Sequence, residues 1–420
     1  MRLEDCRLVL LRWPASVNQI SEIAPPVAIS RQTTSVAPEW NLLLAAASPD
    51  ASEHDLGLLR ASFEKIALDR SVEWESLLRL AEEHGLSSLL YQNLSRMPDL
   101  VPPQVLVTLR QRYESNVHKS LFLARELIRL LDCLDTLGIE TISYKGVVLS
   151  ELYYGDLALR QPGDIDLFVR RNVVARIKHA VRELGYTQHV AIPEDAEKDY
   201  IASGYECSFD SPAGRGLLEV QWALQPRFYA VDFDMDGLFD RAVIVSVAGR
   251  NVKTPSAEDL LLVLAIHAAK HEWGRLLWLC DIAQILKRSS LSWTRIRDCA
   301  QEIGVERILH TTLLLTNQLL DTPIPAPLEA AIHADSGARA LADEIAQALA
   351  AGVSHDVQQI SYFRLMIRLR ERPADRLRFL ARLTFTPGPG EWEALPLPRV
   401  LSPLYRVVRL ARLASRLVRR

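Results

Sequence analysis

The feature that most constrains this chain is a pair of aspartates, separated by one residue, in an apolar run typical of a strand. The run Asp164–Val169 reads Asp-Ile-Asp-Leu-Phe-Val and follows a glycine-bearing turn, Tyr144-Lys145-Gly146-Val147. Because side chains alternate between the faces of a strand, Asp164 and Asp166 share one face and the residues Ile165, Leu167 and Val169 form an apolar row on the other. Two adjacent carboxylates repel each other unless a cation lies between them. The pattern therefore predicts a divalent-metal site rather than a solvated strand end.

A third carboxylate fits the same site. Glu219 lies in the middle of the run Leu217-Leu218-Glu219-Val220-Gln221-Trp222, where a lone acid is costly unless it is paired or bound to a metal. The alternative is an acid on an edge strand that faces water. Carboxylate oxygens suit Mg²⁺, and two such ions between three carboxylates would serve phosphoryl or nucleotidyl transfer. We expect Asp164, Asp166 and Glu219 to be the metal ligands and the catalytic residues.

The glycine turn offers a place for phosphate. Gly146 is expected to begin a helix directly after a strand, where backbone N–H groups can hold a phosphate and glycine permits close approach. Lys145 and Arg160 are the nearest cations in the sequence for a triphosphate. Either could instead be a surface charge.

The periodicity of the sequence predicts an α+β protein with a small mixed or antiparallel sheet between helical regions. Helical spacing is expected near 40–48, 55–68, 72–84, 87–96 and 103–137, strand spacing within 139–144, 164–169, 186–192, 205–209 and 217–222, and helices again after Thr254-Pro255. The resulting regions are a disordered leader (1–37), an N-terminal helical region (38–138), a central core (139–255), a C-terminal helical domain (256–384) and a proline-containing linker with a basic amphipathic tail (385–420).

One helical pattern, 257–288, carries a polar stripe. Its members are His267, Lys270, His271, Gly274, Trp278 and Asp281. If the helix is continuous, these positions lie on one face, with Lys270 and His271 near a phosphate or base and Asp281 orienting a histidine. Polar contact between helices is the structural alternative. Zinc binding by His267 and His271 is a further one, but no third ligand is evident nearby.

The charge of the chain is unevenly distributed. The 420 residues have a formal net charge of −3, but residues 361–420 contain 14 Arg, no Lys and 4 acidic residues, so this region carries +10 and the remainder −13. The basic tail could bind RNA, lie on an anionic membrane surface or pack on the acidic body. We favour packing within the chain, and a membrane-surface role second, because aromatic residues for base stacking are sparse among the last arginines. Five scattered cysteines without a Cys-x-x-Cys pair and the lack of a long apolar run predict a cytoplasmic protein.

These motifs resemble the nucleotidyltransferase superfamily typified by DNA polymerase β, in which a Gly-Ser helix start precedes Asp-x-Asp and a third acid on a later strand. The chain is more closely similar to a bacterial family of uncharacterised nucleotidyltransferase-like proteins with a Lys-Gly … Arg … Asp-Ile-Asp-Leu core. The resemblance includes the stretches 267–273 and 276–281 and covers roughly residues 40–412. Val147 stands where the superfamily has serine, and Gln221 where the closer family often has histidine.

The resemblance implies a polymerase-β-like core and Mg²⁺-dependent transfer of a nucleoside monophosphate from an NTP to a hydroxyl or phosphate. Asp164, Asp166 and Glu219 would hold the metals, and Lys145, Gly146 and Arg160 the triphosphate. The acceptor stays open between a small molecule, a sugar, a peptide and a protein, and nucleic acid is not favoured. The alternative is an inactive nucleotide-binding or scaffold protein that keeps the fold.

Overall fold

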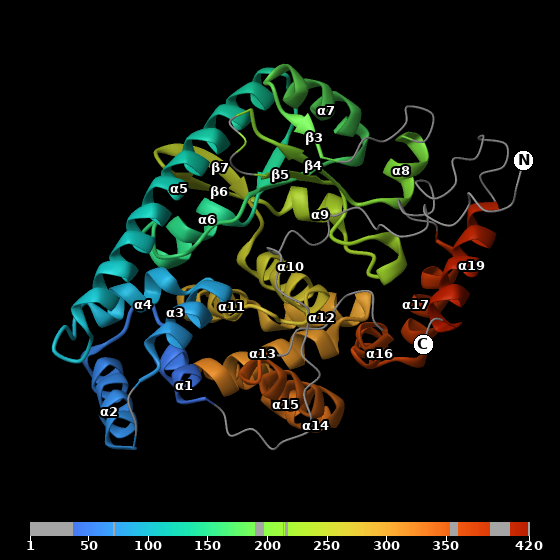
Figure 1. The fold of residues 1–420 in the computed structure, drawn as a ribbon. Coiled ribbons are helices and arrows are strands. Elements are labelled where there is room, and N and C mark those ends of the chain that lie inside the picture. The colour runs from blue at the N-terminus through green and yellow to red at the C-terminus, as the bar shows by residue number, and fades with distance from the viewer. Residues whose placement is uncertain are drawn as a thin grey trace, which may run out of the picture.

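The computed structural model describes residues 37–69, 72–189, 197–212, 214, 217–352, 360–386 and 404–418. Helices make up most of this chain and surround a small sheet (Figure 1). The α+β class predicted from the sequence is therefore confirmed. The leader 1–36 and most of the linker, 387–403, lie outside the described residues.

The N-terminal helical region begins at Pro38 and ends with a long helix. Its helices are α1 (Pro38–Ala45), α2 (Glu53–Asp69), α3 (Trp74–Glu83), α4 (Ser87–Leu94) and α5 (Pro103–Thr136). Proline occupies the first turn of α1 and of α5, where its missing N–H costs nothing. Gly138 follows α5 with a φ of 62°, which suits glycine and ends the helix. All five predicted helices are confirmed.

A five-stranded mixed sheet forms the centre of the molecule. Its strands are β1 (Thr141–Ser143), β2 (Ile165–Val169), β3 (Thr187–Gln188), β4 (Glu206–Asp210) and β5 (Leu217–Gln221). They lie in the order β1-β2-β5-β4-β3, and only the central pair β2 and β5 runs parallel among these neighbours. β3 is shorter than the predicted strand 186–192, whose last three residues lie outside the described part.

Several elements of the central region were not predicted. They are α8 (Glu197–Ser203), α9 (Met235–Asp240) and the ribbon of β6 (Val243–Val247) with β7 (Arg250–Thr254). Ala248 and Gly249 join the ribbon with φ values of 48° and 80°, the positive values that a two-residue hairpin turn requires. The predicted helix after Gly146 is present as α6 (Gly146–Leu149), which continues as a π-helical turn, Ser150–Tyr154. The helix that follows β2 is α7 (Val174–Glu183), with a short 3₁₀ turn before it.

The C-terminal part is a helical domain with a closing helix. It comprises α10 (Ala257–Lys270), α11 (Leu276–Arg288), α12 (Trp293–Ile303), α13 (Glu306–Leu320), α14 (Ala326–Ala334), α15 (Ser336–Ala350), α16 (Ile360–Arg368), α17 (Pro373–Phe385) and α19 (Tyr405–Val418). Ser256 caps α10, because its side chain accepts a hydrogen bond from the Asp259 backbone N–H.

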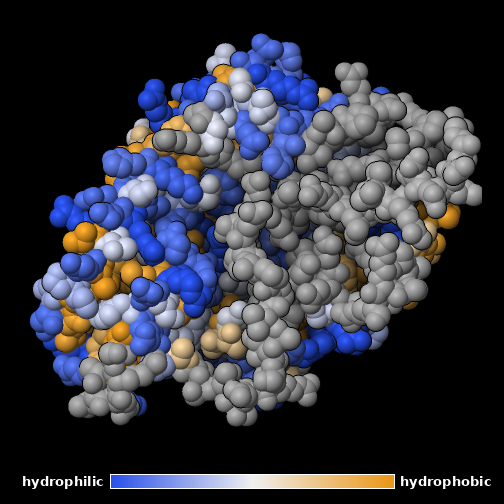
Figure 2. Space-filling model, in the orientation of Figure 1, coloured by the Kyte–Doolittle hydropathy of each residue, from blue (hydrophilic) through white to orange (hydrophobic). Residues whose placement is uncertain are grey.

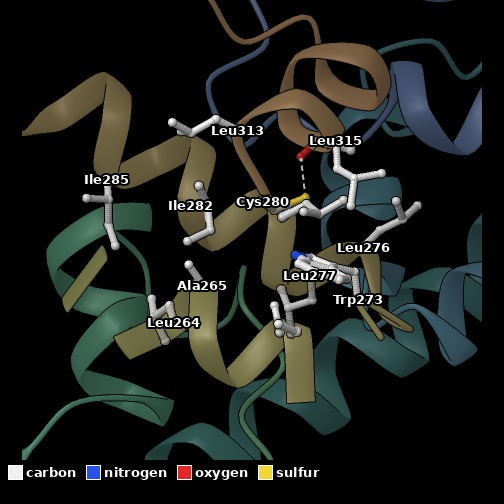
Figure 3. Packing of buried hydrophobic residues seen from close by; sticks show 14 of the residues in the cluster. Leu264, Ala265, Trp273, Leu276, Leu277, Cys280, Ile282, Ile285, Leu313 and Leu315 are labelled. Carbon is white, nitrogen blue, oxygen red and sulfur yellow. Dashed lines mark hydrogen bonds between the residues drawn. The ribbon is translucent and has the colours of Figure 1, made fainter. Parts of the chain in front are cut away.

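The expectation of one continuous helix over 257–288 is wrong. α10 ends at Lys270, and the chain turns through Glu272 and Trp273 with φ values of 54° and 52° before α11 begins. Trp273 is fully buried, and its indole N–H donates to Thr312 Oγ1 on α13 at 3.0 Å. Its ring lies in the apolar cluster of α10, α11 and α13 (Figure 3). Burial of this indole is what offsets the unfavourable backbone of the turn.

The two faces of the sheet have different surroundings. One face carries the apolar row Ile165, Leu167 and Val169, which packs with residues of α5 and α7 in a separate cluster. Those helices lie on the upper side of the sheet in Figure 1, and α10 lies below it. The opposite face carries Asp166, so the predicted division of β2 into an acidic and an apolar row is confirmed.

Within the described residues, none of the helices is both long enough and apolar enough to span a lipid bilayer. The cysteines of this part, Cys133, Cys207, Cys280 and Cys299, are all free.

Candidate functional site

The register of the sheet brings the predicted carboxylates together. Asp166 on β2 is the direct partner of Glu219 on β5 in the parallel pair, so both side chains leave the sheet on the same face. Asp164 immediately precedes β2 and contributes to the same acidic group, because Asp166 raises its pKa by charge and by hydrogen bonding. Asp164, Asp166 and Glu219, predicted from one strand and a later one, thus lie in one group.

Lys145 forms a buried ion pair with this group. Its Nζ lies 2.9 Å from Asp166 Oδ1, and the two residues are 9% and 1% exposed. Burial would lower the pKa of Lys145, but the negative charges of Asp166 and Glu219 outweigh it and hold the pKa well above its ordinary value. The other oxygen, Asp166 Oδ2, is buried and has no hydrogen-bond partner among the described residues. A buried oxygen of this kind could accept a proton or bind a cation.

Gln221 connects the members of the group. Its Oε1 accepts a hydrogen bond from the Tyr144 hydroxyl at 2.7 Å, and its Nε2 donates to Glu219 Oε2 at 2.9 Å. Longer contacts of 3.4 Å join the same Nε2 to Asp166 Oδ1 and Glu206 Oε2. Gln221 is therefore the residue that holds the carboxylates together, a role that the sequence did not suggest.

The surroundings of Asp164 and Glu219 disfavour the ionised form of both carboxyl groups. Burial, with the charge of Asp166, raises the pKa of Asp164 from 3.8 to about 7. Burial and the charges of Glu206 and Asp166 also raise the pKa of Glu219 well above its ordinary value. Crowded, buried carboxylates of this kind are stabilised when a cation binds.

The donor set fits a hard divalent cation, because it consists of carboxylate oxygens and includes the partnerless Asp166 Oδ2. The side chains are not yet arranged around an ion. In the part of the chain that the structure describes, no three His, Cys, Asp or Glu side chains converge in a metal-binding arrangement. Lys145 and Gln221 engage Asp166 and Glu219 instead.

A fourth acid extends the site on β4. Glu206 faces Gln221 across the β4–β5 pair, and its Oε1 accepts a hydrogen bond from the Tyr205 hydroxyl. Lys270, at the end of α10, donates to the same Tyr205 hydroxyl at 2.8 Å. Burial lowers the pKa of Lys270, and the nearby charges of Glu206 and Glu219 act against that fall. The prediction had placed Lys270 near the site and had missed Glu206 and Tyr205, although the alternation Glu206-Cys207-Ser208-Phe209 signals a polar face.

The two histidines of α10 form a ring cluster beside this site. The ring centroids of His267 and His271 are 4.9 Å apart, and Trp278 on α11 lies 5.3 and 5.4 Å from them. Burial and the nearby Lys145 and Lys270 lower the pKa of both histidines well below the ordinary value, so both are neutral at neutral pH. No third ligand for zinc joins them within the described residues.

Asp281 does not orient a histidine, which corrects the prediction. Its carboxylate binds Arg160 through two hydrogen bonds, 2.8 Å to Nε and 2.9 Å to Nη2, and also accepts one from the Tyr154 hydroxyl at 2.8 Å. Arg160 is 4% exposed. This buried pair ties the segment before β2 to α11 and gives Arg160 a structural partner, while its contact with a phosphate stays a prediction.

The backbone at position 146 explains why a glycine is found there. Its φ is +55°, and a Cβ at this position would lie 2.8 Å from the Asp164 carbonyl oxygen. Glycine thus permits the turn that carries Lys145 to approach the turn that carries Asp164. Val147, which follows it, is buried and has no hydroxyl to offer a phosphate.

Comparisons with known proteins identify the family of the chain but not the roles of its residues. No curated protein matches the chain. Among solved structures, an antigenic nucleotidyltransferase-like protein from Paracoccidioides brasiliensis aligns at 16% identity and a TM-score of 0.32, over 51% of this chain and 92% of that one. A family model described as uncharacterised nucleotidyltransferase matches residues 70–321, which is more than half of the chain and includes every carboxylate of the site. By that match, the chain belongs to this family of uncharacterised nucleotidyltransferases.

Proposed function

We propose that this protein is a Mg²⁺-dependent nucleotidyltransferase that moves a nucleoside monophosphate from an NTP to an acceptor hydroxyl or phosphate. The observation that carries the proposal is the pairing of Asp166 and Glu219 across the parallel strands, with a buried Asp166 oxygen that has no hydrogen-bond partner in the described part of the chain. Membership of a nucleotidyltransferase family supports the same chemistry.

Asp164, Asp166 and Glu219 are the residues that would hold the metal, as two ions in the family's pattern. When bound, the metal would neutralise negative charge on the phosphates and orient the reacting oxygens. For these residues to hold a metal, Lys145 would leave Asp166 Oδ1 or share it, and Gln221 would release Glu219. Lys145 is then placed to pair with a phosphate of the nucleotide, since its charge no longer serves the carboxylate alone.

The reaction has a simple balance of bonds. The acceptor oxygen attacks the α-phosphorus, and the bond from that phosphorus to the β-phosphate oxygen breaks, which releases pyrophosphate. The acceptor proton passes to a base, and the Glu219 carboxylate is our candidate because it lies in the same group as Asp166. Lys270, held by Tyr205, would contact the leaving phosphates or the acceptor from the α10 side.

The products of NTP breakdown test this proposal. The protein would be incubated with Mg²⁺ and each NTP, with water as the default acceptor, and the phosphorus products separated. We expect nucleoside monophosphate and pyrophosphate, with both lost in Asp166→Asn. Release of inorganic phosphate and nucleoside diphosphate by the wild type would contradict nucleotidyl transfer.

A catalytically inactive nucleotide-binding or scaffold protein is a second candidate, favoured by the direct contact of Lys145 with Asp166. In that case the lysine replaces the metal permanently. Lys145→Met separates the two functions: a scaffold loses stability because Asp166 is left buried without its partner, and it gains no activity. A transferase keeps metal binding, which now compensates the same carboxylate.

A further inference from the structure

Exposed apolar side chains are concentrated at the end of the chain. In the described residues, twelve large apolar side chains are exposed, and six of them belong to α17, α19 and the residue before α19. They are Leu377 (69% exposed), Leu380 (42%), Phe385 (54%), Leu404 (46%), Val407 (59%) and Leu410 (41%). We call these six residues the outer apolar face. Exposed apolar residues normally occur singly, whereas a concentration of them marks an interaction surface.

On each helix the outer apolar face is opposite a buried side. Leu377, Leu380 and Phe385 fall on one side of α17 by helical spacing, while Phe379 and Leu383 point to the other and are buried. α17 is therefore apolar on two sides, and packing onto the body covers only the inner one.

The same arrangement recurs on α19. Val407 and Leu410 are exposed there, while Tyr405 and Arg409 are buried.

Contacts with the body fix the orientation of α19. Arg409 Nε donates to the Leu383 carbonyl on α17 at 2.8 Å, and its guanidinium lies 5.6 Å from the centre of the Phe228 ring. This supports the expectation that the tail packs within the chain. It also means that the outer apolar face is presented by a docked helix pair, not by a free tail. Apolar side chains are visible at the right-hand edge of Figure 2, where Figure 1 places α17 and α19.

The charge around the outer apolar face is positive on balance, although Arg382 is paired with Asp232 outside the two helices and Arg409 is buried. α17 and α19 together contain seven arginines, no lysine and one carboxylate, Asp375. Asp375 is itself buried and paired with Arg372 and Arg378. Arg406, by contrast, is exposed beside Val407. Two copies of this face would bring like charges together, whereas an anionic surface would be attracted to it.

We propose that the outer apolar face, with the arginines of α17 and α19, docks the protein on an anionic lipid surface. Helices in this interfacial arrangement place apolar side chains at the boundary of headgroups and acyl chains, while arginine heads remain with the phosphates. The proposal is independent of the nucleotidyltransferase site, because α17 and α19 contribute none of its carboxylates.

Co-sedimentation of the full chain with vesicles tests the proposal. Vesicles of phosphatidylcholine alone would be compared with vesicles in which about a quarter of the lipid is phosphatidylserine. We expect binding to the phosphatidylserine vesicles, weaker binding at high ionic strength, and little binding to phosphatidylcholine. Leu377→Glu and Val407→Glu should each reduce the bound fraction, by about tenfold in partition coefficient.

Matched controls are available elsewhere on the surface. Leu58 on α2 and Val107 on α5 are each 55% exposed, and Leu58→Glu and Val107→Glu should leave vesicle binding unchanged. Arg406→Gln should weaken binding and its salt dependence without a change in thermal stability. Absence of vesicle binding, or equal loss in the control variants, would overturn the proposal. So would a sedimentation mass of a dimer that Leu377→Glu converts to a monomer, since the face would then join two copies of the chain.

Discussion

The two faces of the central sheet are built from the same strands but differ in their role. On one face Leu167, Leu218 and Val220 are fully buried in an apolar cluster. On the other face, one residue along each strand, Asp166 and Glu219 carry charges whose burial is unfavourable. Because side chains alternate along the strands, apolar packing on the first face can offset the cost of burying carboxylates on the second.

The contrast between the two faces indicates which of them is the candidate functional surface. An apolar row needs no ligand, because packing satisfies it. Crowded carboxylates such as Asp164 and Glu219, whose pKa values are raised, need protons, an internal cation or a metal. The following predictions test this division, from the largest effect to the smallest.

The largest effect is expected on activity. Asp166→Asn removes a charged ligand without changing side-chain volume, so we expect turnover of NTP to fall about a thousandfold. Stability should fall as well, because Lys145 is left buried without its counter-charge, so turnover is compared per folded molecule. Asp210→Asn, at the exposed end of β4, is the control and should leave the rate unchanged. Equal rates for wild type and Asp166→Asn would show that the carboxylate face does not act in catalysis.

The buried pair between Asp281 and Arg160 should be the most sensitive point for stability. Asp281→Asn leaves the guanidinium buried without its counter-charge, and we expect a loss of about 3–5 kcal/mol in the free energy of unfolding. Asp240→Asn breaks an exposed pair with Arg170 and should cost at most about 1 kcal/mol. Urea denaturation of both variants measures the difference. Similar losses in the two would mean that the buried pair is not structural.

On the apolar face, a loss of side-chain volume should lower stability but leave turnover unchanged. Leu218→Ala removes a fully buried side chain, and we expect a loss of about 2–5 kcal/mol in the free energy of unfolding with turnover per folded molecule retained. Leu137→Ala, at a site that is 44% exposed, is the comparison and should be nearly neutral. A selective loss of turnover in Leu218→Ala would show that the two faces are not separable.

The last effect is a dependence of stability on pH, and it arises from Asp164. Its pKa is raised from 3.8 to about 7 on folding, so the folded state holds the proton more tightly. Its contribution to stability is fully present below pH 3.8 and is lost as the pH rises through about 7. Asp164→Asn lacks this dependence, and in the presence of a chelator it should gain stability relative to wild type across that interval. A stability difference that does not change with pH would contradict the raised pKa.

The local pattern of the sequence was sufficient to predict elements that depend on neighbouring residues. The Asp164–Val169 alternation placed the acidic and apolar rows correctly, and proline and glycine marked the ends of α5. The third carboxylate was found because Glu219 interrupts an apolar strand.

Features that depend on distant contacts were not accessible in this way. The break between α10 and α11 depends on Trp273 contacting Thr312, 39 residues later. Asp281 binds Arg160 from 121 residues away, so sequence proximity suggested a histidine instead. Glu206 was missed because its role emerges only from its pairing with Gln221 across two strands.

The most direct test of the central claim is a thermal titration of the purified protein with Mg²⁺ and each of the four NTPs, beside the double variant Asp164→Asn/Asp166→Asn. The account predicts a rise in melting temperature that requires Mg²⁺, favours one NTP and is absent from the double variant. A rise of equal size in the double variant, or none with any NTP in the wild type, would contradict a metal-dependent nucleotide site on the carboxylate face.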